Sequence, residues 1–306
     1  MSGQGEEQAP RWLPRSDARQ AFVATLCSAV NLDESVGLFH DELGELPVLG
    51  PYSYSRNACV IDIECTPQQA WALLRALRRR LTTTDVYLQP ENTAPMRLLV
   101  CDMDMTIVAA ETLDEVAARL GLGERIAAIT TRAMHGEIDF DSALRERIAM
   151  LAGQPEQVFH DIVCDLRLNP GARELLTAAK SAGLHCVLVS GGFAQVVEPI
   201  ARQLGFDEYF CNYLEVEDGR LSGAVRDPIV NADFKCSQLQ RVARSQEVTL
   251  DECCAIGDGA NDLPMICAAG LGIAYRGKPI LRAASACRID ATDLSSAIHF
   301  MRLATP

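Results

Sequence analysis

Two aspartates that follow a short apolar stretch are the first residues here whose types and spacing could do chemistry. Asp102 and Asp104 lie two positions apart, just after the expected strand 97–101. Two carboxylates held this close repel each other unless a cation neutralises them or one is protonated. The pair therefore suits a site where one carboxylate attacks a substrate and the other moves a proton. Taken alone, a solvated turn explains such a pair at least as well.

A second acidic segment, GDGAND at 257–262, supports the chemical interpretation. It ends another apolar run and contains Asp258, Asn261 and Asp262. Hard oxygen ligands at two strand ends suit Mg²⁺, which prefers carboxylate and water to imidazole or thiolate. An ordinary turn could need the glycines, but it would not need three polar side chains at these spacings. The sequence therefore predicts a Mg²⁺ site.

Two further features could hold an anion. Ser190 and Gly191 follow the apolar run LHCVLV and precede a helical pattern, so a small hydroxyl and open backbone N–H groups would meet at a helix N-terminus. An ordinary strand-to-helix turn fits this segment equally well. Lys235, one of only three lysines, lies at the start of a predicted helix, where its ammonium could act as a point charge between phosphate and carboxylate. A surface lysine is the alternative.

Arg147 is the most informative residue of the region between these motifs. It falls beside the apolar stripe of the predicted helix FDSALRERIAML. An inward guanidinium needs a partner, which a substrate carboxylate would provide with two hydrogen bonds. A structural ion pair is the alternative. By contrast, 272–278 matches GxxxxGK, but Pro279 replaces the Ser or Thr of a phosphate-binding loop, and these glycines are interpreted as turn residues.

Short apolar strands that alternate with helical patterns organise the chain from residue 93 on. Such an arrangement predicts an α/β fold with a parallel sheet covered on both faces. Ligands of these sheets bind beyond the carboxyl ends of the strands, where the polar motifs fall. The segment 107–168 is helical in character, so we expect a small helical cap inserted in a domain spanning 93–306. The segment 215–225 is typical of a hairpin turning at Asp218 and Gly219.

Residues 1–92 are expected to form a separate small α/β domain. The segment 16–30 fits a short helix, and 58–65 alternates like a strand. Thr66 and Pro67 then begin a strong helix as its N-cap and first residue. A second strand follows it, and a polar segment containing a proline links this domain to the rest of the chain.

Composition excludes several classes of protein. The chain has 306 residues, of which 28 are basic and 41 acidic, for a net charge of −13. This charge argues against a nucleic-acid or anionic-membrane partner. No long apolar run and no export signal occur, so a cytoplasmic protein is expected. The twelve cysteines include no CxxC pair and are expected to be reduced and mostly buried.

Four motifs, in this order, resemble those of the haloacid-dehalogenase superfamily of phosphohydrolases. They are DMDMT (102–106), VSGG (189–192), Lys235 and GDGAND. The segments ETLDEVA, AMHGEIDF, ALRERI and GKPIL are similar to those of members that hydrolyse phosphoserine. The resemblance implies a Rossmann-like parallel sheet with a helical cap, and Mg²⁺-dependent hydrolysis of O-phospho-L-serine as the last step of serine biosynthesis. The N-terminal region is similar in placement to the ACT-like domain of bacterial members.

The resemblance also implies roles for the matching residues. Asp102 would be the nucleophile, and Asp104 would protonate the leaving serine and then activate water. Asp102, Asp258 and the backbone carbonyl of Asp104 would hold Mg²⁺. Ser190, Gly191, Lys235 and Asn261 would bind the phosphate, and Asp262 would position Lys235. Glu111 would bind the substrate's ammonium and Arg147 its carboxylate, and Met134 and Phe140 would line the cap side. Met105 departs from the family, where serine is common, which puts local packing in question.

Two other functions stay open from the sequence. One is a related phosphatase or phosphotransferase for another small phosphomonoester. The other is a non-catalytic amino-acid sensor that uses the N-terminal domain and a retired phosphatase fold. The sequence also leaves open the ligand of that domain and the oligomeric state, for which a homodimer is one option.

Overall fold

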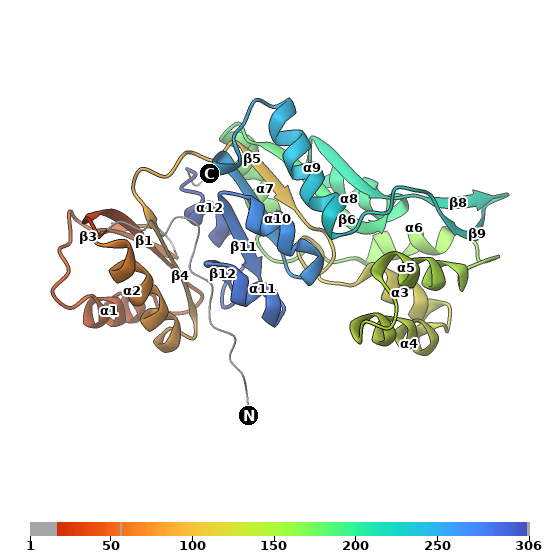
Figure 1. Cartoon of the computed structure of the whole chain (residues 1–306), viewed down its shortest axis with the longest axis horizontal. Coiled ribbons are helices and arrows are strands. Elements are labelled where there is room, and N and C mark those ends of the chain that lie inside the picture. Colours follow the sequence, from red (N-terminus) through yellow and green to blue (C-terminus); the bar gives the residue numbers. More distant parts are fainter. Residues whose placement is uncertain (1–16, 56, 305–306) are drawn as a thin grey trace.

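A six-stranded parallel sheet forms the centre of the protein (Figure 1). The computed structural model describes residues 17–55 and 57–304. The strands lie in the order β12-β11-β10-β5-β6-β7. Their bounds are β5 (Leu98–Cys101), β6 (His185–Phe193), β7 (Glu208–Asn212), β10 (Cys253–Gly257), β11 (Leu271–Tyr275) and β12 (Cys287–Ile289). The expected α/β fold with a parallel sheet is confirmed.

Apolar side chains cover both faces of this sheet. On β5, Leu98 and Val100 pack in one apolar cluster, and Leu99 and Cys101 pack in another, because successive side chains of a strand point to opposite faces. The helices beside the sheet are α7 (Ala172–Ser181), α8 (Ala194–Leu204), α9 (Ala232–Ser245), α10 (Leu263–Ala268), α11 (Pro279–Ala284) and α12 (Ser296–Phe300), with 3₁₀ turns at Leu250–Glu252 and Ala260–Asp262. All twelve cysteines are free and most are buried, as expected.

Helices occupy the segment where the cap is expected. They are α3 (Thr112–Arg119), α4 (Gly123–Met134), α5 (Phe140–Ala149) and α6 (Gln157–Asp165). A hairpin of β8 (Leu214–Glu217) and β9 (Arg220–Val225) extends from the core to these helices (Figure 1). Its turn has φ of 50° at Asp218 and 74° at Gly219, as a two-residue hairpin turn requires. Backbone N–H groups of Gly153 and Leu221 bond across to the carbonyls of Leu221 and Gln154, so the hairpin is joined to the cap.

The N-terminal residues form a separate four-stranded antiparallel sheet with two helices. The elements are β1 (Gln20–Ser28), α1 (Leu32–Leu43), β2 (Ser53–Tyr54), β3 (Ala58–Cys65), α2 (Pro67–Arg80) and β4 (Thr84–Pro90), and the strand order is β2-β3-β1-β4. This βαββαβ order is ferredoxin-like. The likeness to an ACT domain stays a prediction. Thr66 caps α2, and its hydroxyl and the Gln69 side chain form a capping box.

The helix expected over 16–30 is wrong. From Gln20 to Ser28 the chain is strand β1, which pairs with β3 on one side and β4 on the other; Ser16 lies outside the described residues. This central strand is almost continuously buried, so its apolar run has no alternation that would distinguish it from a buried helix. The pairing partners, which decide the outcome, come from distant parts of the sequence.

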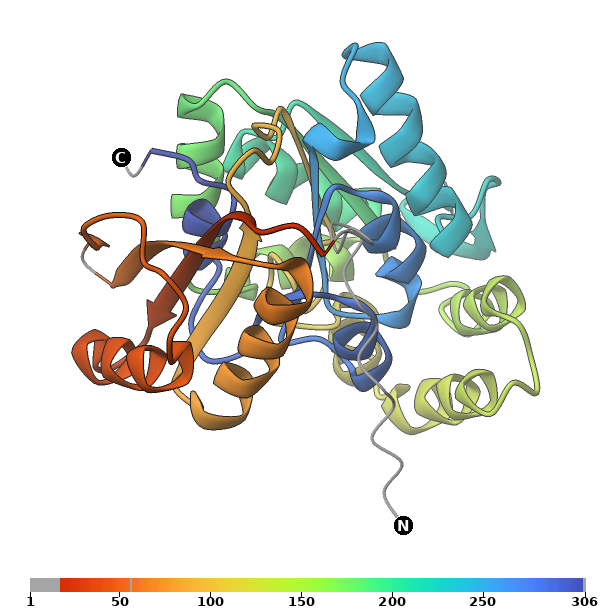
Figure 2. The ribbon, with the colours of Figure 1, turned by 60° about the vertical axis from the view of Figure 1, so that its left-hand side comes forward.

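One buried carboxylate fastens the N-terminal unit to the central domain. Asp85 on β4 is 6 % exposed and accepts backbone N–H bonds from residues 290–292 and the hydroxyl of Thr292. Nearby, Gln89 donates to the carbonyl of Phe300, whose ring meets Tyr87 edge-on. Figure 2 shows the N-terminal unit (red to orange) beside the blue C-terminal segments. The N-terminal unit is thus packed at a defined place, at the opposite end of the molecule from the cap (Figure 1).

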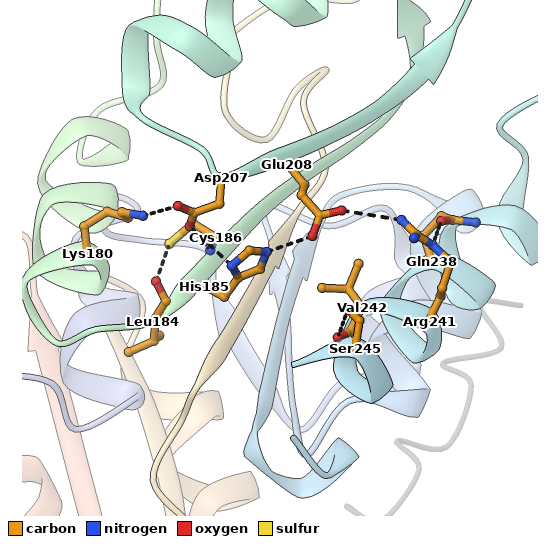
Figure 3. Close-up of polar contacts among 10 residues, drawn as sticks. All are labelled: Lys180, Leu184, His185, Cys186, Asp207, Glu208, Gln238, Arg241, Val242 and Ser245. Atoms are coloured by element: carbon orange, nitrogen blue, oxygen red, sulfur yellow. Dashed lines mark hydrogen bonds and ion pairs between the residues drawn. The ribbon is translucent and has the colours of Figure 1, made fainter. Parts of the chain in front are cut away.

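A chain of charged side chains lies at the amino ends of β6 and β7 (Figure 3). Lys180 forms an ion pair with Asp207, and His185 Nε2 lies 2.9 Å from Oε1 of Glu208. The other carboxylate oxygen of Glu208, Oε2, lies 3.5 Å from Nη2 of Arg241. These side chains are partly exposed, so each pair contributes at most about 1 kcal/mol to stability. The cluster lies at the opposite end of the sheet from Asp102 and Asp258, which follow the carboxyl ends of β5 and β10.

Candidate active site

The sheet order places two acidic segments side by side. From β5 the strands β6 and β7 follow in order toward one edge of the sheet, and from β10 the strands β11 and β12 follow toward the other edge. The direction in which strands are added therefore reverses between β5 and β10. Ligands of doubly wound sheets bind beyond the carboxyl ends at this reversal. Asp102 follows β5 and Asp258 follows β10, and the backbone N–H of Asp102 donates to the carbonyl of Ile256 at 2.9 Å. The fold therefore brings together the two motifs that the sequence singles out.

Lys235 is the buried cation of this cluster. It comes from the first turn of α9, and its Nζ donates to Oδ1 of Asp102 at 2.5 Å and to Oδ1 of Asp262 at 2.8 Å. Burial alone would lower the pKa of Lys235, but the two carboxylates outweigh it and hold the pKa above its usual value. Lys235 is therefore a charged ammonium with no exposed surface. The surface-lysine alternative is wrong.

The 257–262 loop is shaped around Asp262. Its Oδ2 accepts the backbone N–H groups of Asp258 at 3.2 Å and of Gly259 at 3.0 Å, while its Oδ1 binds Lys235. A Cβ at Gly257 would lie 2.5 Å from the Asp262 carboxylate, so only glycine fits there. Both oxygens of Asp262 already have partners. This arrangement suits a side chain that orients Lys235 and the loop rather than one that binds a substrate.

The acidic residues of the site can hold a divalent cation. Carboxylate oxygens of Asp102, Asp258 and Asp262 lie within 4.8 Å of one another. Burial and the neighbouring Asp262 raise the pKa of Asp102, against the effect of Lys235. Burial also raises the pKa of Asp258 to about 6, although Lys278 opposes this. Three carboxylates therefore face one buried lysine, Lys235, and one partly exposed lysine, Lys278, which leaves the cluster short of positive charge. Since Asp262 is occupied, Asp102 and Asp258 are the side chains that fit Mg²⁺ best.

Asp104 has the properties of a proton-transfer group. Burial and the charge of Glu111 raise its pKa to about 7, while hydrogen bonds from Thr112 oppose the shift. Oδ2 accepts the Thr112 hydroxyl at 3.2 Å, and Oδ1 is buried without a protein partner among the described residues. A carboxyl that titrates near neutral pH can both give and take a proton. Its unpartnered oxygen is the one available for such a transfer.

The turn that presents Asp104 is held by Asn169. Met105 has a φ of 56°, a left-handed conformation that costs a non-glycine residue about 1–2 kcal/mol. The Asn169 side chain donates to the carbonyls of Met105, Thr106 and Val108 at 2.8–3.2 Å. The Met105 side chain is 40 % exposed, so it does not fill the core. The departure from the family pattern at this position therefore leaves the buried packing unchanged.

We expect metal to stabilise the protein more at high pH than at low pH. The folded-state pKa values of Asp104 (about 7) and Asp258 (about 6) lie above the unfolded value. The contribution of these two carboxyl groups to folding stability is therefore complete below about pH 4, where both are protonated, and is lost as the pH rises through 6 and 7. Mg²⁺ neutralises the ionised form, so it should raise Tm more at pH 7.5 than at pH 5.5. Thermal unfolding in EDTA and in Mg²⁺ measures the difference. An equal rise at both pH values, or the same pH trend in Asp258→Asn, would contradict this.

Ser190 and Gly191 lie near the carboxyl end of β6, which pairs with the strand that leads to Asp102, and they form a cradle at that edge of the sheet. The Ser190 hydroxyl accepts the N–H of Gly192 at 2.9 Å, and the side chain is fully buried. Asn212 fixes the loop from behind, because it donates to the carbonyl of Gly191 at 2.7 Å and accepts the N–H of Val230 at 2.9 Å. Asn212 is not predicted from the sequence, because its role depends on these two contacts. The cradle suits a small tetrahedral anion.

The predicted cap-side residues differ in how close they lie to this centre. Burial lowers the pKa of Arg147, although Asp114 and Glu111 act against it. Arg147 is half-buried; among the described residues it has no ion pair within 4 Å, and its Nε donates to the carbonyl of Ala143 at 3.3 Å. Phe140 points its ring toward Gly191, where a Cβ would lie 3.8 Å from Cζ. Met134 is 82 % exposed. Asn261 is half-buried, with Oδ1 against Gly259.

Lys278 is a residue at this site to which the sequence analysis assigns no role. Its Nζ lies 3.6 Å from Glu111 Oε1 and 3.7 Å from Asp258 Oδ2, and its backbone N–H donates to the carbonyl of Asp258 at 2.8 Å. Gly272 lies in β11 rather than in the expected turn, and Gly277 lies in the short segment between β11 and α11, so no phosphate-binding loop forms here. The scarcity of lysine in the chain and the place of Lys278 in the GKPIL segment are the sequence signals that could have identified it.

Comparison with known proteins decides the family. A family model described as haloacid dehalogenase-like hydrolase matches residues 99–266. The chain belongs to this family. Among the relatives of the HAD-like hydrolase described here is the phosphoserine phosphatase of Lactococcus lactis subsp. lactis, 42 % identical over 204 residues, which span 67 % of this chain and 94 % of that protein.

Solved structures of HAD-like hydrolases extend the likeness to the N-terminal unit. A HAD family hydrolase from Salmonella enterica subsp. enterica serovar Typhi superposes with a TM-score of 0.84 at 28 % identity, over 92 % of this chain and 98 % of that one. A phosphoserine phosphatase described as a phospho-aspartyl intermediate analogue gives a TM-score of 0.63 at 34 % identity, over 68 % of this chain and 99 % of its own. Among the described residues, no helix is long and apolar enough to cross a bilayer.

Proposed function

We propose that this protein is a Mg²⁺-dependent phosphatase that hydrolyses O-phospho-L-serine to L-serine and phosphate through a phosphoaspartyl intermediate. The observation that carries the proposal is the pairing of a phosphate cradle with two opposite charges on the cap side. The negative charges of Asp114 and Glu111 lie close enough to Arg147 to oppose the lowering of its pKa by burial, and Arg147 has no ion pair within 4 Å in the described part of the chain. A zwitterionic amino acid supplies an ammonium for Glu111 and a carboxylate for Arg147. The named activity of the Lactococcus relative supports the same substrate.

In the first half of the proposed reaction, Asp102 attacks phosphorus. A carboxylate oxygen of Asp102 forms the new P–O bond while the bond from phosphorus to the serine oxygen breaks. Lys235, which binds Asp102, and the buried Ser190 hydroxyl stabilise the negative charge that develops on the phosphoryl oxygens in the transition state. Asp104 gives its proton to the departing serine oxygen, which its pKa of about 7 permits at neutral pH.

In the second half, the same groups release phosphate. Asp104, now ionised, takes a proton from water as the water oxygen attacks phosphorus. The bond from phosphorus to Asp102 breaks and restores the free carboxylate. Asp102, Asp258 and the carbonyl of Asp104 are the groups that would hold Mg²⁺, which supplies positive charge against the phosphate and its transition state. A cytoplasmic location and a homodimer remain predictions from the sequence.

A screen for released phosphate tests this proposal. The purified protein is given phosphoserine, phosphothreonine, phosphoglycolate and an aryl phosphate, each with Mg²⁺ or with EDTA. Phosphoserine with Mg²⁺ should give the highest kcat/KM, and EDTA should abolish it. A higher kcat/KM for a substrate without an ammonium group would instead support a phosphatase for another phosphomonoester. No release from any ester would favour the non-catalytic sensor.

We expect Arg147→Ala to weaken phosphoserine hydrolysis selectively. Removing a charged partner of a substrate carboxylate costs about 2–4 kcal/mol, which is a loss of about 30- to 1,000-fold in kcat/KM. Most of the loss should appear in KM, because the guanidinium binds a part of the substrate that does not react. Turnover of the aryl phosphate should change by less than about threefold. An equal loss on both substrates would argue against amino-acid recognition by Arg147.

A further inference from the structure

Side-chain hydrogen bonds tie the cap helix α5 to the short segment 225–231. On α5, Arg145 donates from Nη2 to Asp227 at 2.5 Å and from Nη1 to the carbonyl of Val225 at 3.3 Å. One turn earlier, Asp141 accepts the Asn231 side-chain amide at 3.1 Å through Oδ1 and at 3.4 Å through Oδ2. Arg145 and Asp227 are exposed, whereas Asp141 and Asn231 are both half-buried. The second contact is therefore the stronger link between cap and core.

Asn231 has a second task, which fixes the direction of its amide. Its Oδ1 accepts the N–H of Phe234 at 3.0 Å, so it is the N-cap of α9, and its carbonyl accepts the N–H of Lys235 at 3.0 Å. With Oδ1 committed to the helix, Nδ2 is left to donate to the cap. One side chain thus starts the helix that carries Lys235 and holds the helix that carries Phe140 and Arg147.

We propose that Asp141 and Asn231 are positioning residues that latch the cap over the phosphate cradle. The latch places Phe140 against Gly191 and brings Arg147 to the amino-acid end of the substrate. This inference rests on the proposed function for the meaning of that placement. If the latch weakens, the closed form becomes less populated, and the apparent affinity for substrate falls in proportion to that population. The reacting groups themselves are untouched, so the effect belongs in KM more than in kcat.

Exchanging the two side chains tests the latch. Asn231→Asp keeps a good N-cap for α9, because aspartate caps as well as asparagine, but it sets two carboxylates face to face. We expect KM for phosphoserine to rise about tenfold, with kcat within about threefold, and the amides of 139–149 to exchange hydrogen about tenfold faster. Adding Asp141→Asn to the same protein restores an amide and a carboxylate in exchanged places. Both measurements should then return to within about twofold of the starting protein.

Two single variants separate the latch from a general effect of charge. Asp141→Asn alone removes a negative charge facing an anionic substrate, so a pure charge effect would lower KM, whereas the latch predicts a rise. Glu124→Gln changes the charge of the cap equally at an exposed position of α4 and should leave both measurements unchanged.

The result that overturns the latch is a double variant as impaired as Asn231→Asp, or unchanged hydrogen exchange in Asn231→Asp or in Asp141→Asn. Hydrogen exchange is measured on the free protein and needs no substrate. If exchange follows the predicted pattern but phosphoserine releases no phosphate, the proposed function fails and the latch stands. If phosphoserine is hydrolysed but exchange does not follow the predicted pattern, the proposed function stands and the latch fails.

Discussion

Asp102→Asn is expected to lower kcat by about 10⁴-fold or more while the fold is kept. The amide oxygen is not a nucleophile, so the first of the two displacements is lost, and single removals of a nucleophile in other enzymes cost this much. Asparagine has the shape of aspartate, and Lys235 keeps its bond to Asp262. Removing a buried carboxylate whose charged form is disfavoured should also leave the metal-free protein no less stable than before.

Acid quenching during turnover checks the role of Asp102 directly. The unchanged protein should carry phosphate covalently, as detected by its intact mass, and Asp102→Asn should carry none. Asp104→Asn is the matched comparison, because it should still accept phosphate from an aryl ester, whose leaving group needs no proton, and release it slowly. Turnover by Asp102→Asn above about one hundredth of the original rate would rule out this nucleophile.

Lys235→Met is expected to damage both stability and activity. It leaves Asp102 and Asp262 buried without their cation, and breaking a buried ion pair in this way costs about 3–5 kcal/mol. The free energy of unfolding in urea, measured at pH 7.5 in EDTA, should fall by that amount. Turnover should fall by about 10³-fold, because the phosphoryl oxygens lose a fixed positive charge in a site that excludes water.

Lys180→Met is the matched control for this loss. Lys180 also pairs with an aspartate, Asp207, but its side chain is 40 % exposed (Figure 3). Water screens this pair, so its removal should change the free energy of unfolding by less than about 1 kcal/mol and leave kcat unchanged. If Lys235→Met costs no more than Lys180→Met, the buried pairing does not stabilise the fold.

The catalytic motifs could be predicted from sequence because a parallel sheet brings its strand ends to one edge. Asp102, Ser190 and Asp258 each end an apolar run, so their meeting follows from the topology alone. The β1 strand could not be predicted in the same way. Its burial depends on β3 and β4, which pair with it from later positions in the chain, and the local pattern lacks that information.

Contacts between cap and core were also beyond the sequence. Lys278 lies near Glu111, and Asn231 binds Asp141, because the cap packs against the core in one particular position. No local pattern encodes that placement. Nor did the spacing of Met134 and Phe140 reveal that one is 82 % exposed and the other 40 %. Residues placed by the sheet were therefore easier to predict than residues whose contacts depend on how the cap packs against the core.

The Asp85 contact has a consequence for the order in which the protein can be completed during translation. Its backbone partners lie 205 to 207 residues later in the chain. At about 5–20 residues per second, the ribosome takes roughly 10–40 s to make that stretch. Until Phe300 has been synthesised, the sheet face that carries Cys27, Ala58 and Tyr87 stays uncovered, because these side chains share one apolar core with Phe300. The first unit to be synthesised is thus the last to be covered, which makes the nascent chain most exposed to misassembly at its N-terminal sheet.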